Sequence, residues 1–270
     1  MIELTESQFQ AVIALLPVSD GYVEPRAILE GNNPGWVFAN SATTPEVALI
    51  WSQGNDGFYL LGRQVTPYAE ELNAFIDTHL RPRLLSRDNT FIEISSVPPV
   101  SDDALQSVFK SRSLISWTQS VYAYKSKVLL PTPSLPEGQL CNVKDIIGKH
   151  SIKNPTFVHD MILDNWHSIE SFLANGNGYC VLIQDMVASL AFTGWIAGNT
   201  HEISIETGEK HRRKGFAKTC ATALINHYLS KGHTPHWECE ATNLASAKLA
   251  ETLGFSKLHD YTCYGFSILH

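Results

Sequence analysis

The chain has 270 residues, of which 44% are hydrophobic, so it is long enough for roughly two domains with ordinary apolar cores. Its net charge of −7 argues against a nucleic-acid partner, and the lack of any stretch of ~20 apolar residues argues against a membrane span. Five widely spaced cysteines without a CxxC pair, and an N-terminus without a signal-peptide pattern, lead us to expect reduced thiols, no zinc site and a cytoplasmic location.

The first half of the chain predicts a mixed α/β domain. Strands are expected at 35–40, 46–53, 58–63, 91–97 and 115–124, where apolar residues alternate or run together. Pro67 opens a helical pattern that continues to Leu85, and a shorter capped helix is expected at 102–110. Residues 129–138 contain three prolines and a glycine and are the best candidate for a linker. The sequence therefore predicts domains at 1–128 and 139–270.

The second half predicts the same order of elements. A helical region runs from near Phe157 to Ala174, and the elements after it are strands at 179–184, 187–195 and 202–207, a helix at 215–230, a strand at 236–240, a helix at 244–253 and a strand at 261–268. Both halves read strand, strand, strand, helix, strand, helix, strand. An internal repeat is one explanation of this order, and chance similarity of two α/β domains is the other.

A basic loop lies between the strand-like segment 201–205 and the helix that follows it. Arg212, Arg213 and Lys214 precede Gly215 and the small Ala217. A helix N-terminus carries unpaired N–H groups and a partial positive charge, and glycine lets the backbone approach a ligand closely. The pattern therefore predicts a phosphate-binding site, although a solvated basic turn would look similar.

The sequence Arg212-Arg213-Lys214-Gly215-Phe216-Ala217 fits the pattern Arg/Gln-x-x-Gly-x-Gly/Ala. With Asn243 and the ending Leu253-Gly254-Phe255, it resembles the GNAT N-acetyltransferase superfamily over residues 139–270. Residues 205–207, with Trp237 and Cys239, look closest to the zwittermicin-resistance type. The resemblance implies an α/β (α+β) fold with a mixed, mostly antiparallel, splayed sheet flanked by helices, and an N-terminal α/β domain that is possibly a degenerate GNAT-like repeat.

The resemblance also implies acetyl-CoA as cosubstrate. Backbone groups before the loop would pair with pantetheine, and the loop amides would hold the pyrophosphate. The residues expected to contact acetyl-CoA are Ile205, Glu206, Thr207, Arg212, Arg213, Lys214, Gly215, Phe216, Ala217, Lys218, Asn243 and Ser246. Asn243 can equally be the N-cap of the helix that follows it. The first half has Pro67 and only Gly62 where the second half has its loop, so we expect no cofactor there.

The expected general base is Glu202, with Glu206 on the same strand face as the second candidate and His201 as a weaker one. Many GNAT enzymes have a tyrosine as general acid where this chain has Ala250, so Tyr264 or Tyr261 on the last strand, or water, would replace it.

The expected function is an acetyl-CoA-dependent N-acetyltransferase for a primary amine of a small molecule, such as an antibiotic or a metabolite. An acidic groove with Glu202, Glu206, Glu238 and Glu240 would suit a cationic acceptor. No metal site is expected, because the histidines show no HExxH spacing. A monomer or homodimer is expected. The alternative is a non-catalytic acyl-CoA-binding protein of GNAT fold with a role in sensing or assembly.

Overall fold

The computed structural model describes residues 1–18, 21–135 and 137–269. Contacts divide the chain into two compact units. The first unit contains Met1–Gln119, Glu240–Thr242 and Asp260–His270, and the second contains Ser120–Cys239 and Asn243–His259. The division therefore falls inside a strand, ahead of the proline-rich segment 129–138, and the C-terminal residues belong to the first unit.

The first unit is built on a mostly antiparallel sheet. Its strands are β1 (Ile2–Glu3), β2 (Gly35–Ala39), β3 (Val47–Ser52), β4 (Gly57–Gly62), β5 (Phe91–Ser96) and the end of β12 (Phe255–Ser267). Neighbours pair antiparallel from β1 to β4, β4 pairs with β5 in parallel, and β5 pairs antiparallel with β12 from Cys263 to Ser267. The C-terminal part of β12 belongs to this unit and forms that final ladder.

Helices cover both faces of the first sheet. They are α1 (Phe9–Ile13), α2 (Val23–Leu29), α3 (Ala69–Phe75), α4 (Arg81–Leu85) and α5 (Asp102–Val108). All of β3 is buried, and its side chains alternate between two cores. Leu49 packs in the core that contains side chains of α3 to α5, whereas Ile50 packs in the core that contains side chains of α1 and α2. Both faces of this strand are therefore apolar.

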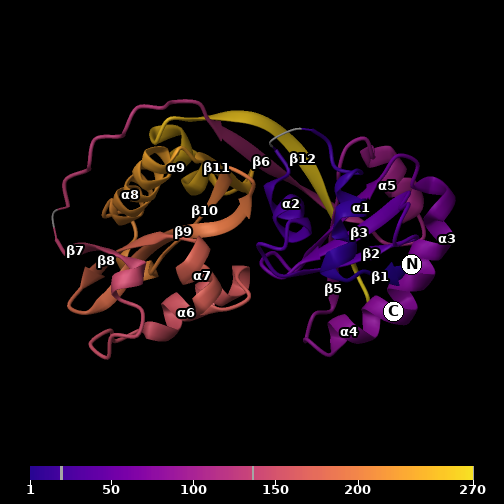
Figure 1. Ribbon diagram of the computed structural model, residues 1–270, viewed down its shortest axis with the longest axis horizontal. Coiled ribbons are helices and arrows are strands. Elements are labelled where there is room, and N and C mark those ends of the chain that lie inside the picture. Colours follow the sequence, from indigo (N-terminus) through magenta and orange to yellow (C-terminus); the bar gives the residue numbers. More distant parts are fainter. Residues whose placement is uncertain (19–20, 136, 270) are drawn as a thin grey trace. The chain divides into compact units, whose positions relative to one another are not determined.

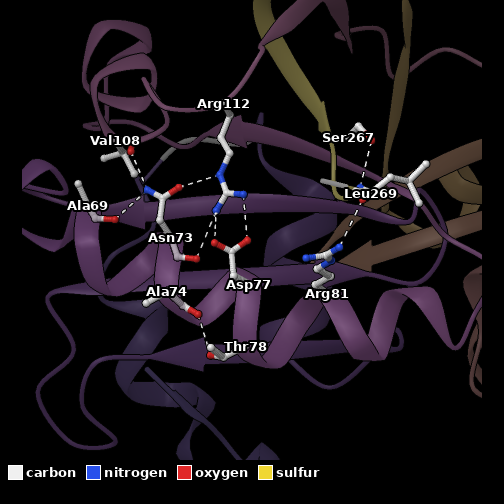
Figure 2. Close-up of polar contacts among 10 residues, drawn as sticks. All are labelled: Ala69, Asn73, Ala74, Asp77, Thr78, Arg81, Val108, Arg112, Ser267 and Leu269. Atoms are coloured by element: carbon white, nitrogen blue, oxygen red, sulfur yellow. Dashed lines mark hydrogen bonds and ion pairs between the residues drawn. The ribbon is translucent and has the colours of Figure 1, made fainter.

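The helix expected from Pro67 to Leu85 is interrupted by a π-helical turn, Ile76–Leu80. Pro82 follows directly and has no N–H to donate, which disfavours a regular α-helical ladder at this point. Side chains serve the carbonyls before the turn: Thr78 Oγ1 donates to Ala74 O at 2.7 Å, and Arg112 Nη2 donates to Asn73 O at 3.3 Å (Figure 2). The same guanidinium forms a bidentate pair with Asp77, so the segment that follows α5 is joined to α3 and the π-helical turn by polar contacts.

The second unit also has a mostly antiparallel sheet. Its strands are β7 (Gln139–Asn142), β8 (Gly178–Ile183), β9 (Met186–Ala197), β10 (Thr200–Thr207) and β11 (Thr234–Glu240), with the end of β6 (Ile115–Tyr124) and the start of β12. Strands β7 to β10 pair antiparallel, and β10 pairs with β11 in parallel. This confirms the mixed, mostly antiparallel sheet that the sequence predicts.

Four helices flank this second sheet. They are α6 (Pro155–Asn165), α7 (Ile169–Asn175), α8 (Phe216–Lys231) and α9 (Leu244–Thr252), with α6 and α7 on one side of β8–β10 and α8 and α9 on the other (Figure 1). Ile203 and Trp237 pack in the core formed with α8, whereas Phe192 packs in the core formed with α6 and α7. Strands β8 and β9 contribute buried side chains to both cores.

Most elements agree with the sequence-based expectation, and the misses lie at short segments. Strand β1, helices α1 and α2, and strand β7 were not expected. Helices α1 and α2 have five and seven residues, too few for a strong periodic signal. None of the helices in the described residues combines the length and the apolarity that a membrane crossing requires.

Candidate active site

Strands β10 and β11 pair over only part of their length. Their ladder places Thr200 beside Thr234 and ends with Glu202 beside His236. Beyond that pair, β10 continues to Thr207 and β11 to Glu240 with no ladder between them in the described chain. The backbone edge of β10 that faces β11 is therefore available to an extended ligand, and the splayed sheet expected from the sequence is confirmed.

The corresponding strands of the first unit remain paired. Strands β4 and β5 form a parallel ladder from Gly57–Glu93 to Leu60–Ser96, and Val97 N then donates to Leu60 O at 3.0 Å. There is no comparable opening along this part of β4, which is in keeping with the expectation that the first half does not hold the cofactor.

The basic loop has the backbone of an anion-binding turn. Arg213 has a φ of 62° and Gly215 a φ of 83°, both in the left-handed region. Helix α8 starts directly after Gly215, and no side chain caps its first turn. Such a turn exposes successive N–H groups on its concave side. A left-handed conformation costs a non-glycine residue about 1–2 kcal/mol, and strain of this kind is concentrated at functional sites.

The cationic side chains of the loop are held by weak surface pairs. Arg212 donates to Thr207 O at 3.2 Å and pairs with Glu206 at 3.4 Å, and Lys214 pairs with Glu137 at 3.0 Å. Exposed pairs contribute only about 0–1 kcal/mol, so phosphate oxygens can replace these carboxylates at little cost. Arg213 is also exposed, and the described residues offer it no ion pair. The loop therefore retains positive charge for a ligand.

Glu206 lies on β10, and its carboxylate contacts both the loop and the neighbouring backbone. Besides its pair with Arg212, its Oε1 accepts a hydrogen bond from the backbone N–H of Thr207 at 3.0 Å. Glu206 therefore has one weak partner in the loop and one at the end of β10, and its expected role as a second base stays a prediction.

Two further residues that were expected to contact acetyl-CoA make structural hydrogen bonds at the start of α9. Asn243 is the N-cap of this helix and accepts from Ser246 N at 3.1 Å, which confirms the capping interpretation. Ser246 Oγ accepts from Trp237 Nε1 at 3.0 Å. Contact of either side chain with pantetheine stays a prediction.

Glu202 lies at the point where β10 and β11 separate. It and His236, its partner in the ladder, are only 7% and 4% exposed. Glu238, on the same face of β11, completes a group of three whose ligand atoms lie within 4.8 Å of one another. Nε2 of His236 is buried without a hydrogen-bond partner in the described chain. Burial, and to a lesser extent His259, lowers the pKa of His236 to about 4, so its imidazole is neutral at pH 7.

His236 was not among the residues expected at the site. Residues 202 and 236 are separated by the loop and α8, so no spacing rule connects them. Only the register of the parallel ladder places them side by side.

The weaker base candidate, His201, lies on the other face of β10. It contacts the ring of Tyr228 on α8 at 5.1 Å and stacks on His233 at 4.1 Å. Burial and the neighbouring His233 lower the pKa of His201 to about 4. These contacts are those of a packed histidine on the α8 side of the sheet.

The expected general acid, Tyr264, lies on the end of β12 that belongs to the first unit. Tyr264 belongs to the core of the first unit, where its hydroxyl accepts from Gln106 Nε2 at 3.0 Å. Burial raises the pKa of Tyr264. Ala250 is fully buried in the core of the second unit. These positions give no support to Tyr264 as the acid, and that role stays a prediction.

Cys239, on β11, is half-buried and unoxidised. Burial raises the pKa of its thiol, so the thiolate that a nucleophile requires is disfavoured. The partly buried Cys239 is therefore better suited to packing than to nucleophilic attack.

Comparison with known proteins agrees with this geometry. Residues 23–264 match the family described as GNAT acetyltransferase. The Bacillus subtilis (strain 168) protein described as "Uncharacterized N-acetyltransferase YdfB" is 26% identical over 240 residues, which is 88% of each chain.

Two solved structures share the fold. A GCN5-related N-acetyltransferase-like protein from Streptococcus suis 89/1591 has a TM-score of 0.65 at 22% identity, covering 96% of this chain and 98% of that chain. A tandem GNAT protein from the clavulanic acid biosynthesis pathway has a TM-score of 0.62 at 12% identity, covering 99% and 98%. The finer resemblance to zwittermicin-resistance proteins stays a prediction.

Proposed function

Because the chain belongs to the GNAT acetyltransferase family and is therefore an acyltransferase, we propose that it transfers an acetyl group from acetyl-CoA to a primary amine of a small molecule. The reaction would be a direct transfer in the cytoplasm. The observation that carries the proposal is the opening between β10 and β11, directly ahead of a left-handed basic loop at the start of α8.

In this proposal acetyl-CoA is bound mainly by backbone groups. Pantetheine lies along the open edge of β10 and pairs with residues 205–207, while the amides of residues 213–218 surround the pyrophosphate. An N–H near Ile205 donates to the thioester carbonyl and stabilises the negative charge that develops there. The side chains of Arg212, Arg213 and Lys214 add charge at the mouth of the loop.

Glu202 is the general base of the proposed reaction. It takes a proton from the ammonium group of the acceptor, and the freed amine forms the new C–N bond as the C–S bond breaks. The nitrogen then releases its second proton to water, and the leaving thiolate takes a proton from water, because Ala250 stands where the family often has a tyrosine. Burial of Glu202 keeps competing water away from this step.

A second candidate function is acyl-CoA binding without turnover, in sensing or assembly. Ala250 is the observation that favours it, since the usual acid is missing. Acetylation of any amine by the wild type would exclude this candidate.

The proposal is tested by isothermal titration with acetyl-CoA. We expect micromolar binding by the wild type and loss of binding in the Arg213→Glu/Gly215→Glu variant. The matched control is Lys231→Glu/Gly232→Glu, which makes the same charge change at the other end of α8 and should bind normally. A panel of primary amines with Glu202→Gln as control then tests turnover. No binding by the wild type would refute the acetyltransferase proposal.

A further inference from the structure

Three buried or half-buried acceptor groups converge where β10 and β11 separate. Glu202 and His236 are paired across the ladder, and Glu238 follows on the same face of β11. One ligand atom from each residue lies within 4.8 Å of the other two. The group therefore presents two carboxylates and one imidazole to a common point.

We propose that Glu202, His236 and Glu238 form a receptor for an ammonium group and that His236 makes it selective for a primary amine. The inference rests on the proposed function, since the bound ammonium is that of the acetyl acceptor.

The spacing of the three groups fits the geometry of a primary ammonium. Its three N–H bonds diverge at tetrahedral angles, so acceptors placed ~2.9 Å from the nitrogen lie ~4.7 Å from one another. The three ligand atoms lie within 4.8 Å of one another, so their spacing allows this arrangement.

His236 is the member of the group that most needs a ligand. Its Nε2 is buried with no partner in the described chain, and an unpaired buried polar atom costs about 1–3 kcal/mol. The lowered pKa of His236 keeps the ring neutral, so one ring nitrogen can accept a hydrogen bond. The titratable groups that face it are Glu202, Glu238 and His259. A ligand N–H satisfies Nε2 without placing another positive charge on the ring.

The arrangement also accounts for the proton that must leave. One N–H proton passes from the ammonium to a carboxylate oxygen of Glu202, which becomes a neutral acid. His236 and Glu238 keep the remaining two N–H bonds while the freed amine attacks the thioester carbon. A tertiary or quaternary amine lacks the N–H bonds to satisfy all three groups.

The test uses the full-length protein with ¹⁵N-labelled histidine and follows the imidazole nitrogens by NMR. The His236 resonance is identified among the 11 histidines by its absence from His236→Gln. Methylammonium chloride is the probe, tetramethylammonium chloride is the matched cation without N–H bonds, and acetyl-CoA binding is measured on the same sample.

We expect methylammonium to shift the His236 resonance in a saturable, millimolar titration, and tetramethylammonium to leave it unchanged. Equal shifts with both cations, or none with either, would overturn the receptor. Zinc perturbing His236 at micromolar concentration while methylammonium does not would also overturn it, in favour of a metal site. If acetyl-CoA binds but methylammonium does not shift the His236 resonance, only the ammonium receptor is refuted and the proposed function is unaffected. If acetyl-CoA does not bind, the result counts against the proposed function itself.

Discussion

Two glycines of α8 allow the function of the basic loop to be separated from its stability. Gly215 precedes the helix with a φ of 83°, and Gly232 follows it with a φ of 77°. A Cβ added at either position would meet no heavy atom within 4 Å. Replacing either glycine with alanine therefore imposes the same backbone penalty and no steric clash.

The expected loss of stability follows from that penalty. Placing alanine in the left-handed conformation destabilises the folded state by about 1–2 kcal/mol. The same substitution lowers the conformational entropy of the unfolded chain, which stabilises the folded state by about 0.4–1 kcal/mol. We therefore expect Gly215→Ala and Gly232→Ala each to lower the free energy of unfolding by about 1 kcal/mol. Urea denaturation measures both values.

Only Gly215→Ala should weaken acetyl-CoA binding. Its loop will either remain strained or turn an N–H away from the phosphates, and a hydrogen bond to a charged group contributes about 1.5–3 kcal/mol. We expect at least a tenfold rise in Kd for Gly215→Ala, and no change for Gly232→Ala. Isothermal titration measures both. If both variants bind acetyl-CoA equally weakly, the effect is due to lost stability. If neither binds more weakly than the wild type, the assigned role of the loop is refuted.

The remaining predictions concern one strained and two buried residues. Arg213→Gly should raise the free energy of unfolding by about 1 kcal/mol while weakening acetyl-CoA binding, and a loss of stability would contradict the strain assigned to its φ of 62°. Burial raises the pKa of Glu24 from 4.5 to about 7, so the stability that its protonated form supplies is present below pH 4.5 and is lost as the pH rises through 7. Glu24→Gln should remove a penalty of about 3 kcal/mol at pH 8 and little at pH 4.5, and a pH-independent difference in urea denaturation would count against this. Burial lowers the pKa of His236 from 6.5 to about 4, so the wild type should lose up to about 3 kcal/mol as the pH falls from 6.5 to 4. His236→Gln should show a flatter profile, and an unchanged profile would refute burial as the cause.

The parts of the site that are contiguous in sequence could be predicted. The strand, the basic loop and the start of α8 follow one another, so Arg213 and Gly215 could be placed at a helix N-terminus from the sequence alone. Asn243 was recognisable as an N-cap by the same local argument, and its hydrogen bond with Ser246 confirms it.

The parts that depend on pairing between distant segments could not be predicted. Glu202 meets His236 through the register of a parallel ladder, which local sequence does not encode strongly. Tyr264 was proposed as the general acid from its place on the last strand, and the pairing of that strand end with β5 in the first unit was not foreseen. The π-helical turn at Ile76–Leu80 is accompanied by side-chain hydrogen bonds from Arg112 and Thr78 to carbonyls before it, and periodicity alone does not show this.

Hydrogen exchange measured with and without acetyl-CoA tests the central claim most directly. The account predicts slower amide exchange in residues 203–218, where pantetheine and pyrophosphate would occupy backbone N–H groups. It predicts unchanged exchange in residues 57–68 of the first unit, where β4 and β5 stay paired. Protection of residues 57–68, or none in residues 203–218 at saturating acetyl-CoA, would contradict the account.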